Sequence, residues 1–184
     1  SMAGFWFFGS QYLQNTRGLT PLETGLAFLP MTLASFAIAM FVPKLSKKFG
    51  NAPFLAGGLA VVMVGTFLLG FATRSSDYTL TLALPMMLIG LGQGASTIRL
   101  TSAGIANVEP KDSGAASGVV SVAVQLGSAL GLSMLVALSS AVDPHGVSAS
   151  VAGSQHLHTA MLGGAALIFL ALASVVIWVL PKQT

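Results

Sequence analysis

The sequence contains very little charge and no cysteine. Asp, Glu, Lys and Arg make up only 7% of its 184 residues, whereas about 25% is usual in a soluble domain. Without cysteine, disulfides and thiolate metal sites are excluded. A phosphate-binding loop of the Gly-x4-Gly-Lys-Ser/Thr kind is also absent, so ATP is not expected as the energy source. The net charge of +3 is scattered along the chain, and a nucleic-acid partner is therefore not expected.

Long apolar stretches take the place of the missing charge. Hydrophobic residues make up 54% of the sequence, and the mean hydropathy is +0.83. A helix needs about 20 apolar residues to cross roughly 30 Å of bilayer hydrocarbon, and charge-free runs of that size occur at 24–43, 49–73, 78–98, 113–142 and 158–180. The sequence therefore predicts an all-α polytopic membrane protein, a single membrane domain over residues 1–184. Its six transmembrane helices are expected near 2–16, 21–43, 52–73, 77–107, 111–140 and 156–180.

The first of these helices is too short to cross a membrane by itself. It contains the apolar block Phe5-Trp6-Phe7-Phe8. One alternative is a signal-peptide core, but no basic stretch precedes the block and no clear small-residue cleavage site follows it. We expect a spanning helix that is truncated at its amino end.

The basic residues between the apolar stretches predict the orientation, because cytoplasmic loops collect Lys and Arg. Five basic residues fall on one side of the predicted bundle and two on the other. This asymmetry predicts a multi-pass protein of the cell inner membrane with its carboxyl terminus in the cytoplasm. The cytoplasmic residues are Lys44, Lys47, Lys48, Lys111 and Lys182, and the two on the opposite side are Arg17 and Arg74.

Local signals mark the helix ends and two irregular points. Thr20-Pro21-Leu22-Glu23 predicts a capping box with proline in the first helical turn. Pro30 and Pro85 fall inside predicted helices, where each removes one backbone hydrogen bond and is expected to kink its helix. Either kink serves as a packing bend or as a flexing point in gating. The segment 139–155 is expected to be a long, mobile external loop.

The predicted helix 111–140 carries two pairs of glycines spaced by four residues. Such small-x3-small patterns let helix backbones approach closely. The two pairs lie about half a turn out of phase, so we expect them to pack against neighbours on opposite sides. The pairs are Gly114 with Gly118, and Gly127 with Gly131.

Polar residues at spacings of three or four form faces on three predicted helices. An amide in hydrocarbon is costly without a partner. These groups therefore face either neighbouring helices or a wet cavity, and both interpretations are open. They are Gln11 and Gln14 on the first helix, Gln93 and Thr97 on the fourth, and Ser117, Ser121, Gln125 and Ser128 on the fifth.

Arg99 is the one charge well inside an otherwise apolar helical run. Near the cytoplasmic end of its helix, a long side chain can reach the membrane interface. Two roles are open: an anchor or ion pair with Glu109, Asp112 or a part of the protein outside this chain, and a role on a transport pathway. No Asp or Glu falls in a predicted membrane interior. A proton-coupled transporter usually needs such a group, so any proton-carrying carboxylate is expected elsewhere.

An intramembrane serine protease is a remote alternative. A serine nucleophile needs a base within hydrogen-bond reach. Ser117, however, is predicted near the cytoplasmic end of its helix, whereas His156 and His158 begin a helix at the opposite end. His145 with these two histidines lacks a nearby acidic ligand, so we expect neither a metal nor a cofactor.

Five stretches of the sequence form a series: Tyr12-Leu13-Gln14, residues 20–30, residues 90–94, Thr101-Ser102-Ala103-Gly104 and residues 114–118. Taken in this order, they resemble the carboxyl-terminal half of the major facilitator superfamily drug:proton antiporters, in the EmrB/QacA-like branch. The resemblance covers essentially the whole chain. It implies one six-helix bundle of two that face each other across a central cavity, with substrate crossing by alternating access. The first, second, fourth and fifth helices would line the cavity, and the third and sixth would pack outside.

The segment 43–51 resembles a degenerate copy of the family's cytoplasmic loop motif. It keeps Leu45, Lys48 and Gly50, but Pro43 replaces the usual glycine and Lys47 replaces the usual acid. The amino-terminal bundle, which in this family usually carries the coupling carboxylates, is expected to lie outside the chain.

We therefore expect a secondary transporter that exports lipophilic small molecules or drugs by proton antiport, and not an enzyme. A half-size transporter that acts as a homodimer or heterodimer is the alternative. The expected partners are the lipid bilayer, a small lipophilic substrate and an amino-terminal helical bundle in the same polypeptide or a partner chain. The candidate cavity-lining residues are Gln11, Gln14, Gln93, Thr97, Arg99, Ser121 and Gln125.

Overall fold

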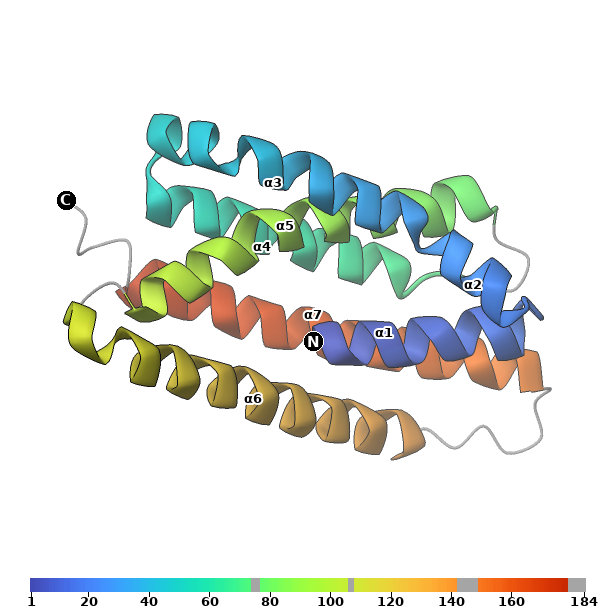
Figure 1. Ribbon diagram of the computed structural model, residues 1–184. Helices are drawn as coiled ribbons and strands as arrows, with labels where there is room; N and C mark the ends of the chain where they lie inside the picture. Colours follow the sequence, from blue (N-terminus) through green and yellow to red (C-terminus); the bar gives the residue numbers. More distant parts are fainter. Residues whose placement is uncertain (74–76, 106–107, 142–148, 179–184) are drawn as a thin grey trace.

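The computed structural model describes residues 1–73, 77–105, 108–141 and 149–178, and the elements it assigns in these ranges are all helical. The long helices lie side by side and alternate in direction, with α2 leading into α3 along one path (Figure 1). This confirms the predicted all-α fold class. The elements are α1 (Met2–Gln11), η1 (Tyr12–Thr16), α2 (Pro21–Ala27), α3 (Leu29–Phe49), α4 (Asn51–Leu69), η2 (Tyr78–Ala83), α5 (Leu84–Ile105), η3 (Pro110–Asp112), α6 (Ser113–Ala141) and α7 (Ala149–Trp178).

The predicted cytoplasmic loop at 43–51 is wrong, because α3 continues through Pro43 to Phe49. Gly50 alone joins α3 to α4. Its φ of 84° lies in the left-handed region that glycine adopts without a steric penalty. A single glycine can therefore reverse the chain here, and Leu45 and Lys48 of the expected loop motif lie on the last turns of α3.

Two other helix ends also differ from the prediction. The helix expected to end at residue 73 ends at Leu69, where Gly70 and Phe71 make a turn. The helix expected to begin at residue 156 begins at Ala149, so residues 149–155 are helical and do not belong to a long loop. The early start has a simple reason: this stretch has no proline and contains alanines that favour helix. The remainder of the expected mobile loop, 142–148, lies outside the described residues.

The capping box at the start of α2 is confirmed. The Thr20 hydroxyl oxygen accepts from the Glu23 backbone N–H at 3.3 Å, and Glu23 Oε2 accepts from the Thr20 backbone N–H at 2.8 Å. Pro21 occupies the first turn, where its missing N–H needs no partner.

The two prolines predicted to kink helices, Pro30 and Pro85, lie next to irregular backbone. The helix expected at 21–43 is divided at Phe28, which has φ −86° and ψ −7°, so that Pro30 falls in the first turn of α3. Pro85 follows the π-helix η2, which ends at Ala83 before α5 continues as a regular α-helix. A second π-helix, η1, extends α1 from Tyr12 to Thr16. Short π segments inside helices often accompany functional sites.

Helix α5 lies against α3 and α4, and glycines set how closely it packs. A Cβ at Gly92 would meet the Gly58 carbonyl oxygen and Val62 of α4, and one at Gly94 would meet the Ser35 carbonyl oxygen of α3. The backbones therefore approach more closely than any larger residue allows.

The glycines of α6 do not play the predicted role within this chain. A Cβ at Gly114, Gly118 or Gly127 would meet nothing within 4 Å, and one at Gly131 would approach only the Ser1 nitrogen, at 3.7 Å. The contacts of α6 with α1 and α7 come instead from larger side chains in its carboxyl-terminal part, such as the fully buried Leu135.

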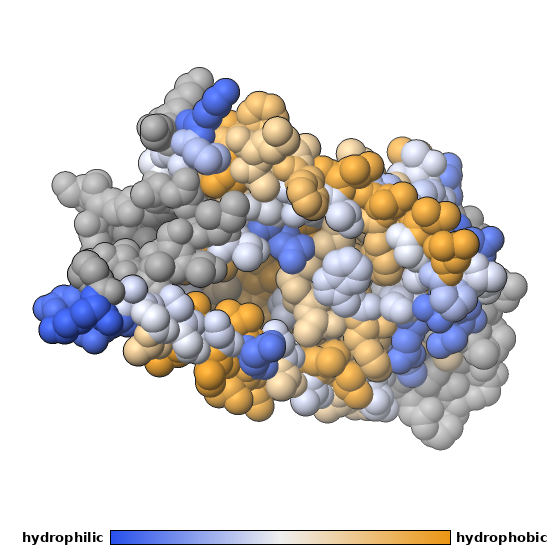
Figure 2. Space-filling model, in the orientation of Figure 1, coloured by the Kyte–Doolittle hydropathy of each residue, from blue (hydrophilic) through white to orange (hydrophobic). Residues whose placement is uncertain are grey.

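Apolar side chains cover much of the surface (Figure 2). Phe36 is 72% exposed and Met40 is 76% exposed, values that are unusual for large apolar side chains in water. Within the part of the chain that the structure describes, four helices are long and apolar enough to cross a bilayer, and a shorter apolar helix covers Pro53–Leu69. The four are Pro21–Ser46, Tyr78–Thr97, Ser113–Ala141 and Val151–Ile177.

Two adjacent glycines of α4 provide a test of this packing. A Cβ at Gly58 would lie 2.5 Å from Ser96 Oγ and 3.2 Å from Gly92 O, whereas one at Gly57 would meet nothing within 4 Å. We expect Gly58→Val to lower the free energy of unfolding by about 1–3 kcal/mol through overpacking. Gly57→Val makes the same change in the same helix and is expected to have little effect. Thermal unfolding of the purified protein in detergent measures the difference, and equal melting temperatures for the two variants would contradict the packing.

Candidate substrate cavity

A cavity of about 370 Å³ lies between α1, α3 and α5. This volume suits a small organic molecule, because ligand pockets typically measure about 300–1,000 Å³. Figure 2 shows pale and blue residues in a hollow on this face, bordered by orange apolar ones. The lining residues are Trp6 of α1, Met31, Thr32, Ser35, Phe36 and Ala39 of α3, and Gln93, Gly94 and Thr97 of α5.

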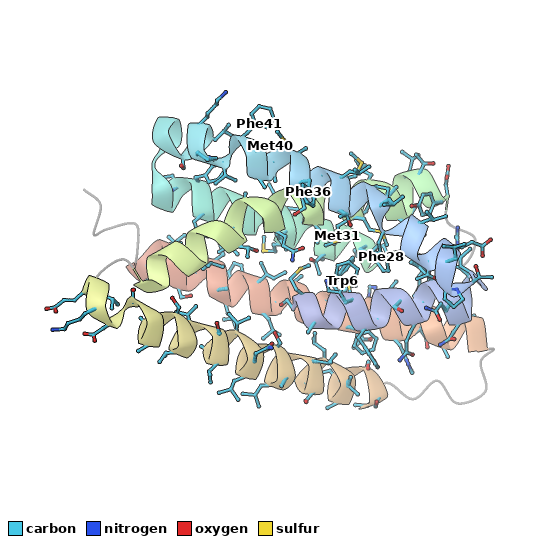
Figure 3. The ribbon with its side chains drawn as sticks, in the orientation of Figure 1. Trp6, Phe28, Met31, Phe36, Met40 and Phe41 are labelled. Atoms are coloured by element: carbon cyan, nitrogen blue, oxygen red, sulfur yellow. The ribbon has the colours of Figure 1, made fainter. Side chains whose placement is uncertain are left out.

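Aromatic side chains form one side of this cavity. The Trp6 ring lies 4.8 Å from the ring of Phe28, which in turn lies 5.8 Å from the ring of Phe5 in an edge-to-face arrangement. Trp6, Phe28 and Met31 lie near one another between α1 and α3 (Figure 3). Because Trp6 is 43% exposed, part of its indole remains available to a ligand. Indole and phenyl rings bind flat apolar molecules and also attract cations to their faces.

Two of the predicted site residues, Gln93 and Thr97, lie together in this cavity. They stand one turn apart on α5, and the Thr97 hydroxyl donates to the Gln93 carbonyl oxygen at 3.0 Å. The Gln93 side chain is half-buried. Its amide supplies both donors and an acceptor to an otherwise mainly apolar wall.

The predicted residues of the first helix lie elsewhere. Gln11 lines a second, smaller cavity of about 220 Å³ between the η1 end of the first helix and α7, together with Asn15, Thr16 and His156. The Gln14 amide donates to Ser10 Oγ at 3.3 Å, one turn back on its own helix. The structure therefore does not bring Gln11 and Gln14 together with Gln93.

The polar residues of α6 also lie apart from the cavity. Ser121 and Gln125 are exposed, and neither lines the two cavities described here. The Ser117 and Ser121 hydroxyls donate to carbonyl oxygens four residues back, at 2.8 Å and 2.9 Å. Such bonds satisfy a serine without any neighbouring helix. Arg99 belongs to α5, and its side chain lies outside the described part of the chain.

Acidic side chains do not line either cavity, as far as the described residues show. Glu23 caps α2, Asp77 caps η2, and Glu109 forms an exposed ion pair with Lys111 at 2.7 Å. Exposed pairs of this kind contribute only about 0–1 kcal/mol. In the described residues, these charged groups therefore lie near helix ends, and Asp, Glu, Lys and Arg line neither cavity.

The sequence did not single out three large side chains of the cavity wall. Trp6 stands in a row of aromatic residues, and Met31 and Phe36 resemble the lipid-facing residues around them. One feature of the sequence could have indicated this wall of the cavity. Thr32 and Ser35 form a polar face, one turn apart on the otherwise apolar helix α3.

The arrangement does not support the hydrolase interpretation. Ser117 belongs to the first turns of α6, whereas His156 lies in the amino-terminal part of α7, and these segments are at opposite ends of the bundle (Figure 1). A nucleophile and its base must lie within about 2.6–3.2 Å of each other. This separation excludes Ser117 and His156 as such a pair.

Several known efflux and resistance proteins are similar to this chain in sequence. Multidrug efflux pump LfrA of Mycolicibacterium smegmatis is 34% identical over 134 residues, which cover 73% of this chain and 26% of the relative. The puromycin resistance protein pur8 of Streptomyces alboniger is 33% identical over 190 residues, covering 96% of this chain and 37% of the relative. Multidrug resistance protein Stp of Mycobacterium tuberculosis is 30% identical, covering 77% and 27%.

The chain thus spans between a quarter and about two fifths of the length of these relatives. The family model for the Major Facilitator Superfamily matches residues 1–184, the whole chain. With its long apolar helices and neutral cavity, the chain belongs to the major facilitator superfamily of multi-pass membrane transporters and is not an enzyme.

Proposed function

We propose that this chain is the carboxyl-terminal bundle of a transporter that exports lipophilic, drug-like molecules from the cytoplasm. The observation that carries the proposal is the cavity of about 370 Å³, whose wall combines Trp6 and Phe36 with the single amide of Gln93. A mainly apolar wall with few polar groups suits ligands that vary in shape but share an apolar surface. The relatives are named as efflux and resistance proteins, which supports this substrate class.

We infer that a second bundle completes the pathway. The relatives are about three to four times as long as the parts of them that match, which favours a larger polypeptide over two half-size chains. Helix α6 offers a second argument. Only 6% of its most apolar membrane-length stretch is buried, and Gln125 is exposed on this helix. An exposed amide in hydrocarbon is costly, so Ser121 and Gln125 are proposed to face the second bundle or the aqueous pathway between the two.

Proton antiport is proposed as the energy source. The walls of the two cavities are free of carboxylates in the described part of the chain. The groups that bind the proton are therefore proposed to lie in the second bundle, while this bundle binds the substrate. Substrate and proton would then compete through alternating access between the two bundles.

The first prediction concerns Gln93. In the full-length protein, Gln93→Leu keeps the side-chain volume but removes the amide from the cavity wall. Loss of one hydrogen bond is expected to raise the KM for export of ethidium about fivefold. Gln155→Leu is the matched control, because Gln155 is exposed near the start of α7 and lines neither cavity. Dye efflux from cells at equal expression measures both variants, and an unchanged KM in Gln93→Leu would remove Gln93 from the site.

The second prediction concerns the energy source. Full-length protein in proteoliposomes is expected to move ethidium against its gradient when a proton gradient is imposed. Addition of a protonophore is expected to abolish this accumulation, because collapse of the gradient removes the driving force. Accumulation that persists after the gradient has collapsed would reject proton antiport but leave export itself in place.

The third prediction concerns orientation. Lys111 is 73% exposed and lies at the α5 to α6 end of the bundle, whereas Asn15 is exposed at the opposite end, in η1. In a full-length protein with its other cysteines replaced, Asn15→Cys is expected to react with an impermeant thiol reagent applied outside intact cells. Lys111→Cys is expected to react only after the membrane is opened, because the lysine-rich end is cytoplasmic. The reverse pattern would invert the proposed topology.

A further inference from the structure

The break between α2 and α3 is held by a side chain from a distant helix. The Tyr78 hydroxyl donates to the Ala27 carbonyl oxygen at 2.9 Å, across 51 residues of sequence. Ala27 is the last residue of α2, directly before Phe28, where the helix is interrupted. The carbonyls around such an interruption lack their regular helical partners and need others.

Tyr78 is itself fixed in place by local structure. It is the first residue of the π-helix η2, and the Asp77 carboxylate caps this helix by accepting from the Thr79 backbone N–H at 3.0 Å. The Tyr78 side chain is half-buried against the hydrophobic core. The hydroxyl therefore reaches Ala27 from a rigid position at the start of the fourth membrane helix.

The same break determines two walls of the candidate cavity. Phe28, at the break, contacts the Trp6 ring, and Met31 and Thr32 follow it within the first turn of α3. The Thr32 backbone N–H and hydroxyl both bond the Phe28 carbonyl oxygen, each at 3.2 Å. A change in the backbone at Phe28 would therefore move both the indole and the α3 wall relative to Gln93.

We propose that Tyr78 is a positioning residue for the substrate cavity. It touches neither the cavity nor a ligand in it, and acts through Ala27 and Phe28 on Trp6 and α3. The hydroxyl links η2, which leads into the Gln93 helix α5, to the break at Phe28 beside Trp6. The bond thereby keeps a fixed separation between the α5 wall and the aromatic wall of the cavity. This inference rests on the proposed function, because it concerns the shape of the proposed substrate site.

The chain contains a matched control for the loss of this hydroxyl. Its other tyrosine, Tyr12, donates to the Thr73 carbonyl oxygen at 2.6 Å, and therefore also satisfies a backbone carbonyl beyond a helix end. Tyr12 lines the second cavity and not the first. Tyr12→Phe and Tyr78→Phe thus remove the same kind of bond at two different places.

The experiment compares these two variants in the full-length protein. Tyr78→Phe is expected to raise the KM for ethidium export about fivefold with kcat nearly unchanged, because a less preorganised cavity binds more weakly. It is also expected to speed hydrogen exchange about fivefold in a peptide covering residues 27–36, measured by mass spectrometry. Tyr12→Phe is expected to leave both quantities within about twofold of the unsubstituted protein, the scale of a mutation far from the site.

Two results would overturn the inference. One is unchanged exchange at residues 27–36 in Tyr78→Phe, and the other is an equal rise of KM in both variants. If the unsubstituted protein does not export ethidium, the proposed function fails for this substrate. The exchange measurement then decides by itself whether Tyr78 holds the break.

Discussion

The structure depends on one constraint: the bilayer interior supplies no water, so each backbone N–H and C=O must find a partner inside the protein. Regular helices meet this requirement along most of the chain. Where a helix stops or breaks, side chains from distant segments supply the missing bonds, and each such bond also ties two helices together. The pairs are Tyr78 with the Ala27 carbonyl at 2.9 Å, Tyr12 with the Thr73 carbonyl at 2.6 Å, and His158 Nδ1 with the Gly70 carbonyl at 2.8 Å.

The same solvent changes how the helices pack. Lipid tails are as apolar as leucine, so close contact between backbones replaces the hydrophobic effect as the source of association. In α5, a Cβ at Gly90 or Gly94 would meet backbone of α3, and one at Gly92 would meet backbone of α4. The helix is thereby wedged between its two neighbours. Gln93 stands between these glycines, so the packing that holds α5 also fixes the cavity amide.

Features that depend on neighbouring residues could be predicted from the sequence, and features that depend on packing could not. The capping box at Thr20 and the irregular backbone near Pro30 follow from local chemistry, and both occur. The serines of α6 gave an ambiguous signal, because a hydroxyl bonded four residues back, as in Ser121, needs no cavity. The sequence did not indicate that Trp6 lines the cavity, because the residues beside it are also aromatic. Only the fold shows that Trp6 is the one that faces the cavity.

The exposed face of helix α6 supports the proposed second bundle. A serine hydroxyl on an exposed helix face can be satisfied within its own helix, but a glutamine amide has more donors and acceptors than one carbonyl can match. Gln125 is exposed in the middle of a helix long enough to cross the bilayer. Lipid would leave that amide unsatisfied at a cost of several kcal/mol. This cost supports the proposal of a protein or aqueous partner along this face, which a second bundle across a central pathway would supply.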